Sequence, residues 1–313
     1  MSDSLGVVDQ LFARDSIARE IARRPTVMAV AGSRAILMQL AHPKVAAGIA
    51  DHSDFRTDPV GRILRTALAF RSFFFHSEKE ASTAAHRVRR IHGRVQGESY
   101  FANDPALLLW VHATTVASMI GAYCQLVREL DRREQERFYE EAKVIAELLG
   151  CPREYQPADL SAMEAYIEST VATLIPTDTG RQLVRELLFV PLRPWGRPMM
   201  WMYRLYIVGS LPVRLRDELH ISWPWWSATL WRIRKLIRAP LIGSRTLARA
   251  TFRHPSPAKG RCRDCRAWSP KLTVQGRCPS CGYAHGDAVL ERVAKFGRLI
   301  GLAEAGRDGT RVA

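Results

Sequence analysis

Four cysteines near the C-terminus have the spacing of a metal site. Cys262 and Cys265 form one C-x-x-C pair, Cys278 and Cys281 form a second, and twelve residues separate the two pairs. Each pair can place two thiolates on one tetrahedral Zn²⁺, and four sulfur ligands leave no open position for a substrate. A redox dithiol needs only one such pair. The spacing therefore predicts a structural zinc ribbon, with a hairpin in the tract 268–276 between the pairs.

A histidine in a basic segment is the second candidate for chemistry. The stretch 87–97, RVRRIHGRVQG, predicts a helix with His92 at its centre, and Ala85, Val88, His92 and Val95 share its apolar face. A buried imidazole needs a partner, which is either a hydrogen-bonding group of the core or a metal such as haem iron. His112, in a long apolar segment, is the competing ligand candidate.

Three further polar residues stand on one face of an earlier helix. Arg62, Arg65 and Thr66 have the spacing i, i+3 and i+4. Two guanidinium groups and a hydroxyl in this arrangement can bind carboxylates or a polar oxygen species. The alternative is that both arginines are solvated surface charges and that Thr66 bonds its own helix backbone.

These motifs occur in an order that resembles a known family. The residues that carry the likeness are the R-x-x-[KR]-T element at 62–66, the V-R-x-x-H helix ending at His92, an N-x-x-x-L helix start at Asn103, the W-x-H-A-T segment around His112, the L-L-G at 148–150 and the segment 211–223, LPVRLRDELHISW. Their order over 27–222 resembles the haem oxygenases related to latex-clearing protein and to the oxygenase of mycophenolic acid biosynthesis, and within them the bacterial members that do not act on rubber.

The resemblance implies haem b chemistry on an apolar, alkene-containing small molecule with O₂. It makes His92 the proximal iron ligand and places Arg62, Arg65 and Thr66 beside the distal pocket. Two departures set this chain apart from the latex-clearing branch, which has a lysine at the position of Arg65 and uses a pocket glutamate. Asp51 is nearest to that glutamate by spacing. Rubber is therefore not the expected substrate.

The elements that must position these residues are predicted to be helices. Amphipathic or apolar segments separated by prolines and polar caps predict helices over 4–24, 26–39 (capped by Thr26), 44–50, 59–75, a helix from Ser77 through the His92 segment, 105–127, 132–149, 160–174, 178–188 and 227–252. Ser77 is expected to cap the His92 helix, and Asn103 is expected to cap the next one. The segment 105–127 has no Asp, Glu, Lys or Arg. Its scattered polar residues favour a buried central helix over a membrane span.

The sequence therefore predicts a large all-α multi-helix bundle with a small C-terminal zinc ribbon. The composition changes at Pro255-Ser256-Pro257, which divides the chain into a helical oxygenase-like domain (1–254), a zinc-ribbon module (255–286) and a C-terminal helix and tail (287–313). A length of 313 residues is ample for such a core. The six cysteines do not form a disulfide framework and the first residues lack an apolar leader, so we expect a reducing cytoplasm.

The positive charge suggests partners other than the substrate. The formal net charge is +15, and residues 190–261 hold 14 Lys and Arg but only two acids, together with six of the eight tryptophans. Such a segment suits an anionic membrane surface or nucleic acid, unless the tryptophans are buried beneath a solvated basic face. A membrane-peripheral oxygenase is compatible with this pattern. The alternative function is a non-enzymatic basic zinc-ribbon protein that binds nucleic acid or an acidic partner.

Overall fold

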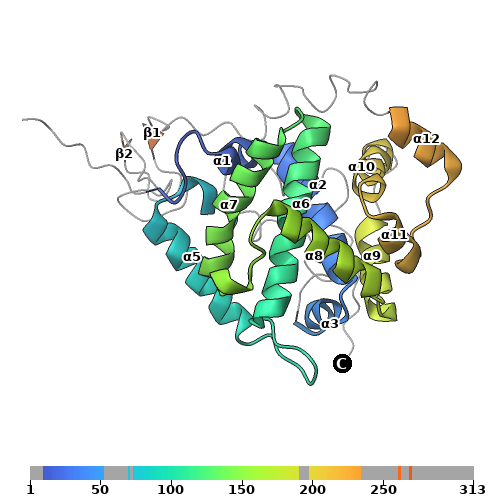
Figure 1. Ribbon diagram of the computed structural model, residues 1–313, viewed down its shortest axis with the longest axis horizontal. Helices are drawn as coiled ribbons and strands as arrows, with labels where there is room; N and C mark the ends of the chain where they lie inside the picture. Colours follow the sequence, from blue (N-terminus) through green and yellow to red (C-terminus); the bar gives the residue numbers. More distant parts are fainter. Residues whose placement is uncertain are drawn as a thin grey trace, which may run out of the picture.

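The computed structural model describes residues 10–52, 70, 73–189, 197–233, 260–261 and 268–269. In these residues the chain forms a bundle of helices (Figure 1), which agrees with the predicted all-α class. One pair of two-residue strands lies near the C-terminus. The helices are α1 (Ile17–Ala22), α2 (Pro25–Leu40), α3 (Pro43–His52), α5 (Glu78–His92), α6 (Pro105–Leu126), α7 (Arg132–Leu149), the short 3₁₀ helix η1 (Arg153–Tyr155), α8 (Leu160–Thr173), α9 (Asp178–Leu188), α10 (Arg197–Gly209), α11 (Val213–Glu218) and α12 (Trp225–Ile233).

The apolar helix α6 is the centre of the bundle. It lies along α2 and also contacts α7 and α8, and its Trp110 and Tyr123 are almost completely buried. Among the described residues α6 is the helix long and apolar enough to cross a membrane, yet 67% of its most apolar window is buried inside the protein. The prediction of a buried central helix over this segment is therefore confirmed.

Polar side chains fix α2 against α6. The Gln39 side-chain amide donates to the Val111 carbonyl at 3.3 Å and to the Thr114 hydroxyl at 3.2 Å. Nearer the start of α2 than Gln39, Arg34 donates to the Ser118 hydroxyl at 2.8 Å. Because buried polar groups must be paired, these bonds restrict how α2 can slide or rotate on α6.

Helix α5 begins as predicted but ends earlier. The Ser77 hydroxyl accepts from the Glu80 backbone N–H, and the Glu80 carboxylate accepts from the Ser77 N–H at 3.0 Å, which is a capping box. The helix ends at His92, so the helix predicted to continue through Gly97 is wrong beyond that residue. The chain turns there because Val95 N–H donates to the His92 carbonyl at 2.9 Å and Ala102 N–H donates to the Val95 carbonyl at 3.0 Å.

Two other helix starts differ from the sequence expectation. The cap of α6 is Asp104, whose carboxylate accepts from the Ala106 N–H at 2.9 Å, and not Asn103. Asn103 instead donates to the Arg89 carbonyl at 3.0 Å, which satisfies one of the last carbonyls of α5. For α2, Pro25 occupies the first turn and Arg24 precedes it, so Thr26 lies inside the helix and does not cap it.

The first helix is much shorter than predicted within the described part. Ser16 caps α1 by accepting from the Arg19 N–H at 3.2 Å, so the helix starts at Ile17. Residues 10–15 before it are not helical, and Gln10 makes a backbone bridge with Ser77. The N-terminal segment therefore packs across the start of α5 and does not extend α1.

The C-terminal region is described at four residues. β1 (Gly260–Arg261) pairs antiparallel with β2 (Trp268–Ser269), with Gly260 opposite Ser269 and Arg261 opposite Trp268. Trp268 is in a strand, as the hairpin prediction over 268–276 implied, but its partner strand precedes the first cysteine pair. The four cysteines and the proposed boundaries at 254 and 286 lie outside the described residues, so the zinc ribbon and the domain division stay predictions.

Candidate functional site

The last residue of α5, His92, carries a partly buried imidazole. Its Nδ1 atom is buried and has no hydrogen-bond partner among the described residues, and the side chain as a whole is half-buried. Burial lowers the pKa of His92 below its ordinary value because it disfavours the charged form. His92 is therefore a neutral imidazole at neutral pH, which is the form that binds a metal.

The loop that follows His92 is tied to α3. Tyr100 donates to the carboxylate of Asp51 at 2.7 Å, and the His52 ring nitrogen Nε2 lies 3.1 Å from the Gln96 carbonyl. Desolvation, together with the hydrogen bond to Asp51, raises the pKa of Tyr100 to about 12, so its hydroxyl stays protonated and donating. Asp51, the residue nearest by spacing to the pocket glutamate of the latex-clearing branch, thus anchors the loop after His92.

Gly97 permits this loop to close. A Cβ placed on Gly97 would lie 2.5 Å from Cε1 of the Tyr100 ring, which is closer than real contacts allow. Backbone bonds from Gly97 N–H to the Tyr100 carbonyl at 3.0 Å and a bridge between Gln96 and Phe101 complete the turn. The loop is therefore a structured support for the end of α5.

His112 lies deep between α6 and α7. Its ring packs on Tyr139 with centroids 6.4 Å apart, and its buried Nε2 atom has no hydrogen-bond partner in the part of the chain that the structure describes. Desolvation, with a smaller contribution from the charge of Lys143, lowers its pKa to about 4. Lys143 itself is buried over the Tyr139 ring, forms an ion pair with Glu140 and donates to the Ala158 carbonyl at 2.7 Å.

A third histidine shares this property. His42, in the turn between α2 and α3, also has a buried Nδ1 for which the described residues supply no partner. Burial lowers its pKa, Lys44 lowers it further, and Asp104 opposes both. Within the described ranges, no three or more His, Cys, Asp or Glu side chains converge closely enough to hold a metal ion. In this part of the chain, none of the three imidazoles therefore belongs to such a cluster.

The other predicted site residues cannot be placed against these histidines. Arg62, Arg65 and Thr66 lie in the segment 53–69, and Cys262, Cys265, Cys278 and Cys281 lie in the C-terminal tail, both outside the described residues. Their roles remain predictions.

The sequence analysis missed two partly buried arginines, Arg34 on α2 and Arg204 on α10. Arg34 donates to the Ser118 hydroxyl and to the Ser210 carbonyl at 3.0 Å, and desolvation lowers its pKa to about 10. Arg204 on α10 makes no hydrogen bond or ion pair with the described residues, and its Nε is buried. The available signal was weak: Arg34 interrupts an otherwise uncharged stretch between Thr26 and Leu40.

Comparison with known proteins identifies the family. Residues 19–239 match the family described as "ER-bound oxygenase mpaB/B'/Rubber oxygenase, catalytic domain". The chain belongs to this family. The match extends over the 27–222 range of the sequence resemblance and includes His92 and His112, so the family assignment is confirmed. The chain thus carries an oxygenase catalytic domain of the mpaB and rubber oxygenase type.

The curated relatives of this mpaB/rubber oxygenase-type chain have no stated activity. Two are the uncharacterized proteins Rv2237 of Mycobacterium tuberculosis and Mb2261 of Mycobacterium bovis. Each is 24% identical over 199 residues, covering 60% of this chain and 78% of the relative. No solved structure matches the chain.

Proposed function

We propose that the protein is a haem b-dependent oxygenase that acts with O₂ on an apolar, alkene-containing small molecule. The observation that carries the proposal is the buried ring nitrogen of His92, which has no hydrogen-bond partner among the described residues. The sequence resemblance makes His92 the iron ligand, and this residue lies within the range that matches the family. A neutral imidazole at the end of a capped helix suits an axial ligand. The family membership favours this enzymatic function over the alternative of a non-enzymatic basic zinc protein.

In the chemistry, the protein itself would hold and orient the haem and the substrate. Haem supplies the oxygen-activating iron when bound, whereas the side chains supply the axial ligand, the pocket and its electrostatics. The capping box at Ser77 fixes the start of α5, and the loop anchored by Tyr100 and Asp51 supports its end. His92 would therefore be presented on a helix held at both ends.

The segment 62–66 would complete the site. Arg62 and Arg65 would pair with the haem propionates or stabilise developing negative charge, and Thr66 would donate a hydrogen bond. Arginine at position 65 does not release a proton near neutral pH, so this side chain would act as a fixed charge and not as a proton donor. Because the latex-clearing branch has a lysine at this position, the arginine supports a substrate other than rubber.

The experiment is a spectroscopic titration of the purified full chain with haem. We expect a Soret band at one haem per chain in the wild type and its loss in His92→Ala. His112→Ala is the matched control, since it also removes a buried, unpartnered imidazole but should leave the band in place.

A rescue experiment separates ligation from folding. In His92→Gly, added imidazole should restore the Soret band, because the small molecule can occupy the ligand position. A wild-type chain that shows no Soret shift, or a His92→Ala variant that keeps it while His112→Ala loses it, would contradict the assignment of His92.

A further inference from the structure

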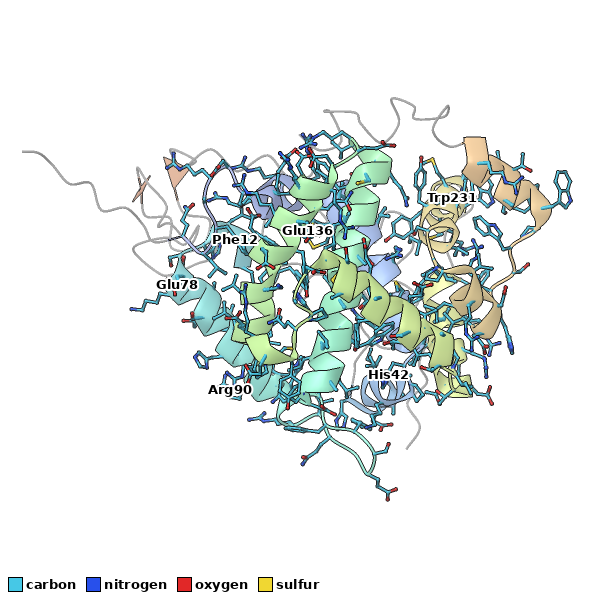
Figure 2. The ribbon with its side chains drawn as sticks, in the orientation of Figure 1. Phe12, His42, Glu78, Arg90, Glu136 and Trp231 are labelled. Atoms are coloured by element: carbon cyan, nitrogen blue, oxygen red, sulfur yellow. The ribbon has the colours of Figure 1, made fainter. Side chains whose placement is uncertain are left out.

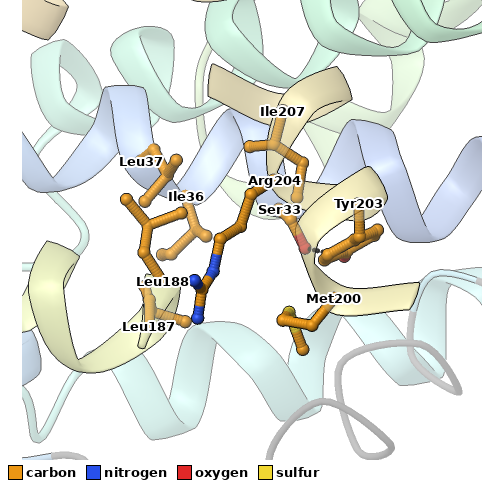
Figure 3. A pocket seen from close by; sticks show the side chains of 9 residues that line it. All are labelled: Ser33, Ile36, Leu37, Leu187, Leu188, Met200, Tyr203, Arg204 and Ile207. Carbon is orange, nitrogen blue, oxygen red and sulfur yellow. Dashed lines mark hydrogen bonds between the residues drawn. The ribbon is translucent and has the colours of Figure 1, made fainter. Parts of the chain in front are cut away.

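A cavity between α2, α9 and α10 is separate from the proposed haem site. It is lined by Ser33, Ile36, Leu37, Leu187, Leu188, Met200, Tyr203, Arg204 and Ile207 (Figure 3). In Figure 1, α9 and α10 lie on one side of α6, whereas α5, which ends at His92, lies on the other. The cavity therefore requires an explanation of its own.

The charged residue of the cavity has no counterion among the described residues. Figure 3 shows the Arg204 side chain reaching between the leucines of α9 and Met200. In the described part of the chain its buried Nε has no hydrogen-bond partner and no carboxylate pairs with the guanidinium, which lies over the Phe189 ring, 4.4 Å from the centroid. Desolvation lowers the pKa of Arg204, with no acidic neighbour to oppose it. A desolvated cation in this position is stabilised by an anion that enters the cavity.

The hydroxyl groups of the cavity are already engaged. Tyr203 donates to the Ala29 carbonyl at 3.1 Å and is also hydrogen-bonded to the Ser33 hydroxyl. Because the tyrosine proton points to a backbone acceptor, the serine hydroxyl is the donor to Tyr203. Among the lining residues, the planar guanidinium of Arg204 thus remains as the unengaged donor group, and its fork geometry matches a carboxylate.

The size and lining of the cavity restrict the ligand further. The cavity has a volume of about 30 Å³, whereas a water molecule needs roughly 10 to 15 Å³ by the same measure. Two or three water-sized groups fit, which matches the three heavy atoms of a carboxylate. The other lining side chains are aliphatic or Met, and the neighbouring Phe189 is 62% exposed. An apolar chain attached to the carboxylate would therefore contact apolar side chains where it leaves the cavity.

We propose that this cavity is a binding site for the carboxylate of an apolar monocarboxylic acid, held by Arg204 and seated between α2, α9 and α10. The site goes beyond the proposed oxygenase chemistry, because it lies away from His92 and does not require haem.

Calorimetric titration of the haem-free full chain with octanoate and with octanol tests the site. Octanoate is expected to bind at least tenfold more tightly than octanol, because only octanoate carries the charge. Arg204→Gln should remove that preference and Arg204→Lys should keep part of it. Arg214→Gln is the control, since Arg214 is half-exposed on α11 and approaches Glu218 at 3.9 Å.

A second variant tests the cavity without touching the charge. Leu187→Phe places a larger side chain in the lining and should weaken octanoate binding while thermal unfolding still reports a folded chain. Equal binding of octanoate and octanol, unchanged octanoate binding in Arg204→Gln, or no octanoate binding by the wild type would overturn the proposal. None of these outcomes bears on the Soret titration, so the two proposals fail separately.

Discussion

Buried imidazoles without partners are the most informative single residues of this protein. His42, His92 and His112 each have a buried ring nitrogen that makes no hydrogen bond with any described residue. Such a group costs free energy unless a ligand or an ordered water satisfies it. His92 is at the end of α5, whereas His112 is in the middle part of the central helix α6 and its ring packs on Tyr139 of α7. We therefore predict that His92 binds the ligand and that burial of His112 makes stability depend on pH.

The pH dependence of stability should reveal His112. Its pKa is about 4 in the folded protein and about 6.5 in the unfolded chain. Between these values the unfolded chain binds the extra proton, so stability rises with pH through this window and is lost as pH falls from 6.5 towards 4. The shift corresponds to about 3 kcal/mol. Urea unfolding at pH 4.5 and 7.5 should show a smaller pH difference in His112→Leu than in the wild type; equal differences would contradict the assignment.

At the scale of elements, the close contact between α9 and α2 requires a residue without a side chain, Gly180. Gly180 is in the first turn of α9, where its N–H donates to the Thr177 cap at 3.1 Å. A Cβ at Gly180 would lie 2.6 Å from the backbone oxygen of Leu40. Because a backbone atom cannot move aside as a flexible side chain can, Gly180→Ala should destabilise the protein by about 1 to 3 kcal/mol. Chemical unfolding measures this loss.

Gly121 provides the matched control for that substitution. It lies within α6, and a Cβ there meets nothing within 4 Å. Replacing a helical glycine by alanine without a clash stabilises by about 0.5 to 1 kcal/mol, so Gly121→Ala should shift stability in the opposite direction. If both alanine variants changed stability equally, the close contact between α9 and α2 would not be the cause.

Elements with strong local signals could be predicted from the sequence, and elements shaped by distant contacts could not. The amphipathic period and caps predicted α7 (Arg132–Leu149) and α9 (Asp178–Leu188) with the bounds that the structure has. The end of α5 was missed because it depends on a loop held by Tyr100 and Asp51, which are far apart in sequence. The Arg204 cavity was missed for the same reason, since it exists only where α2, α9 and α10 meet.

At the scale of the whole molecule, the side formed by α10 and α12 exposes tryptophans. Trp225 is 79% exposed, and Trp201 and Trp226, which stack with centroids 6.0 Å apart, are each more than 40% exposed. Trp231, labelled in Figure 2, is partly buried and packs against Tyr206 and close to Gly209. The described tryptophans of this segment are therefore exposed or partly buried, and none is fully buried.

The exposed tryptophans lead to a prediction about membranes. They belong to the most basic part of the chain, and interfacial tryptophan with nearby Lys and Arg favours anionic lipid. We expect the protein to sediment with vesicles of phosphatidylcholine containing phosphatidylserine, less at high salt, and severalfold less after Trp225→Ala and Trp226→Ala together. Tyr155→Ala, an exposed aromatic on η1, is the control. Salt-sensitive DNA binding without vesicle binding would favour a nucleic-acid partner instead.

The last prediction concerns the independence of the two predicted metal centres. Four cysteine ligands complete the coordination of zinc, so the predicted zinc site would stabilise the folded tail. His92, in contrast, belongs to the helical bundle. Elemental analysis of the purified chain should find one zinc, and Cys262→Ser or Cys278→Ser should lower the zinc content while the haem Soret band remains. His92→Ala should do the reverse. Loss of haem in the cysteine variants, or a full-length chain without zinc, would mean that the tail is not a separate zinc module.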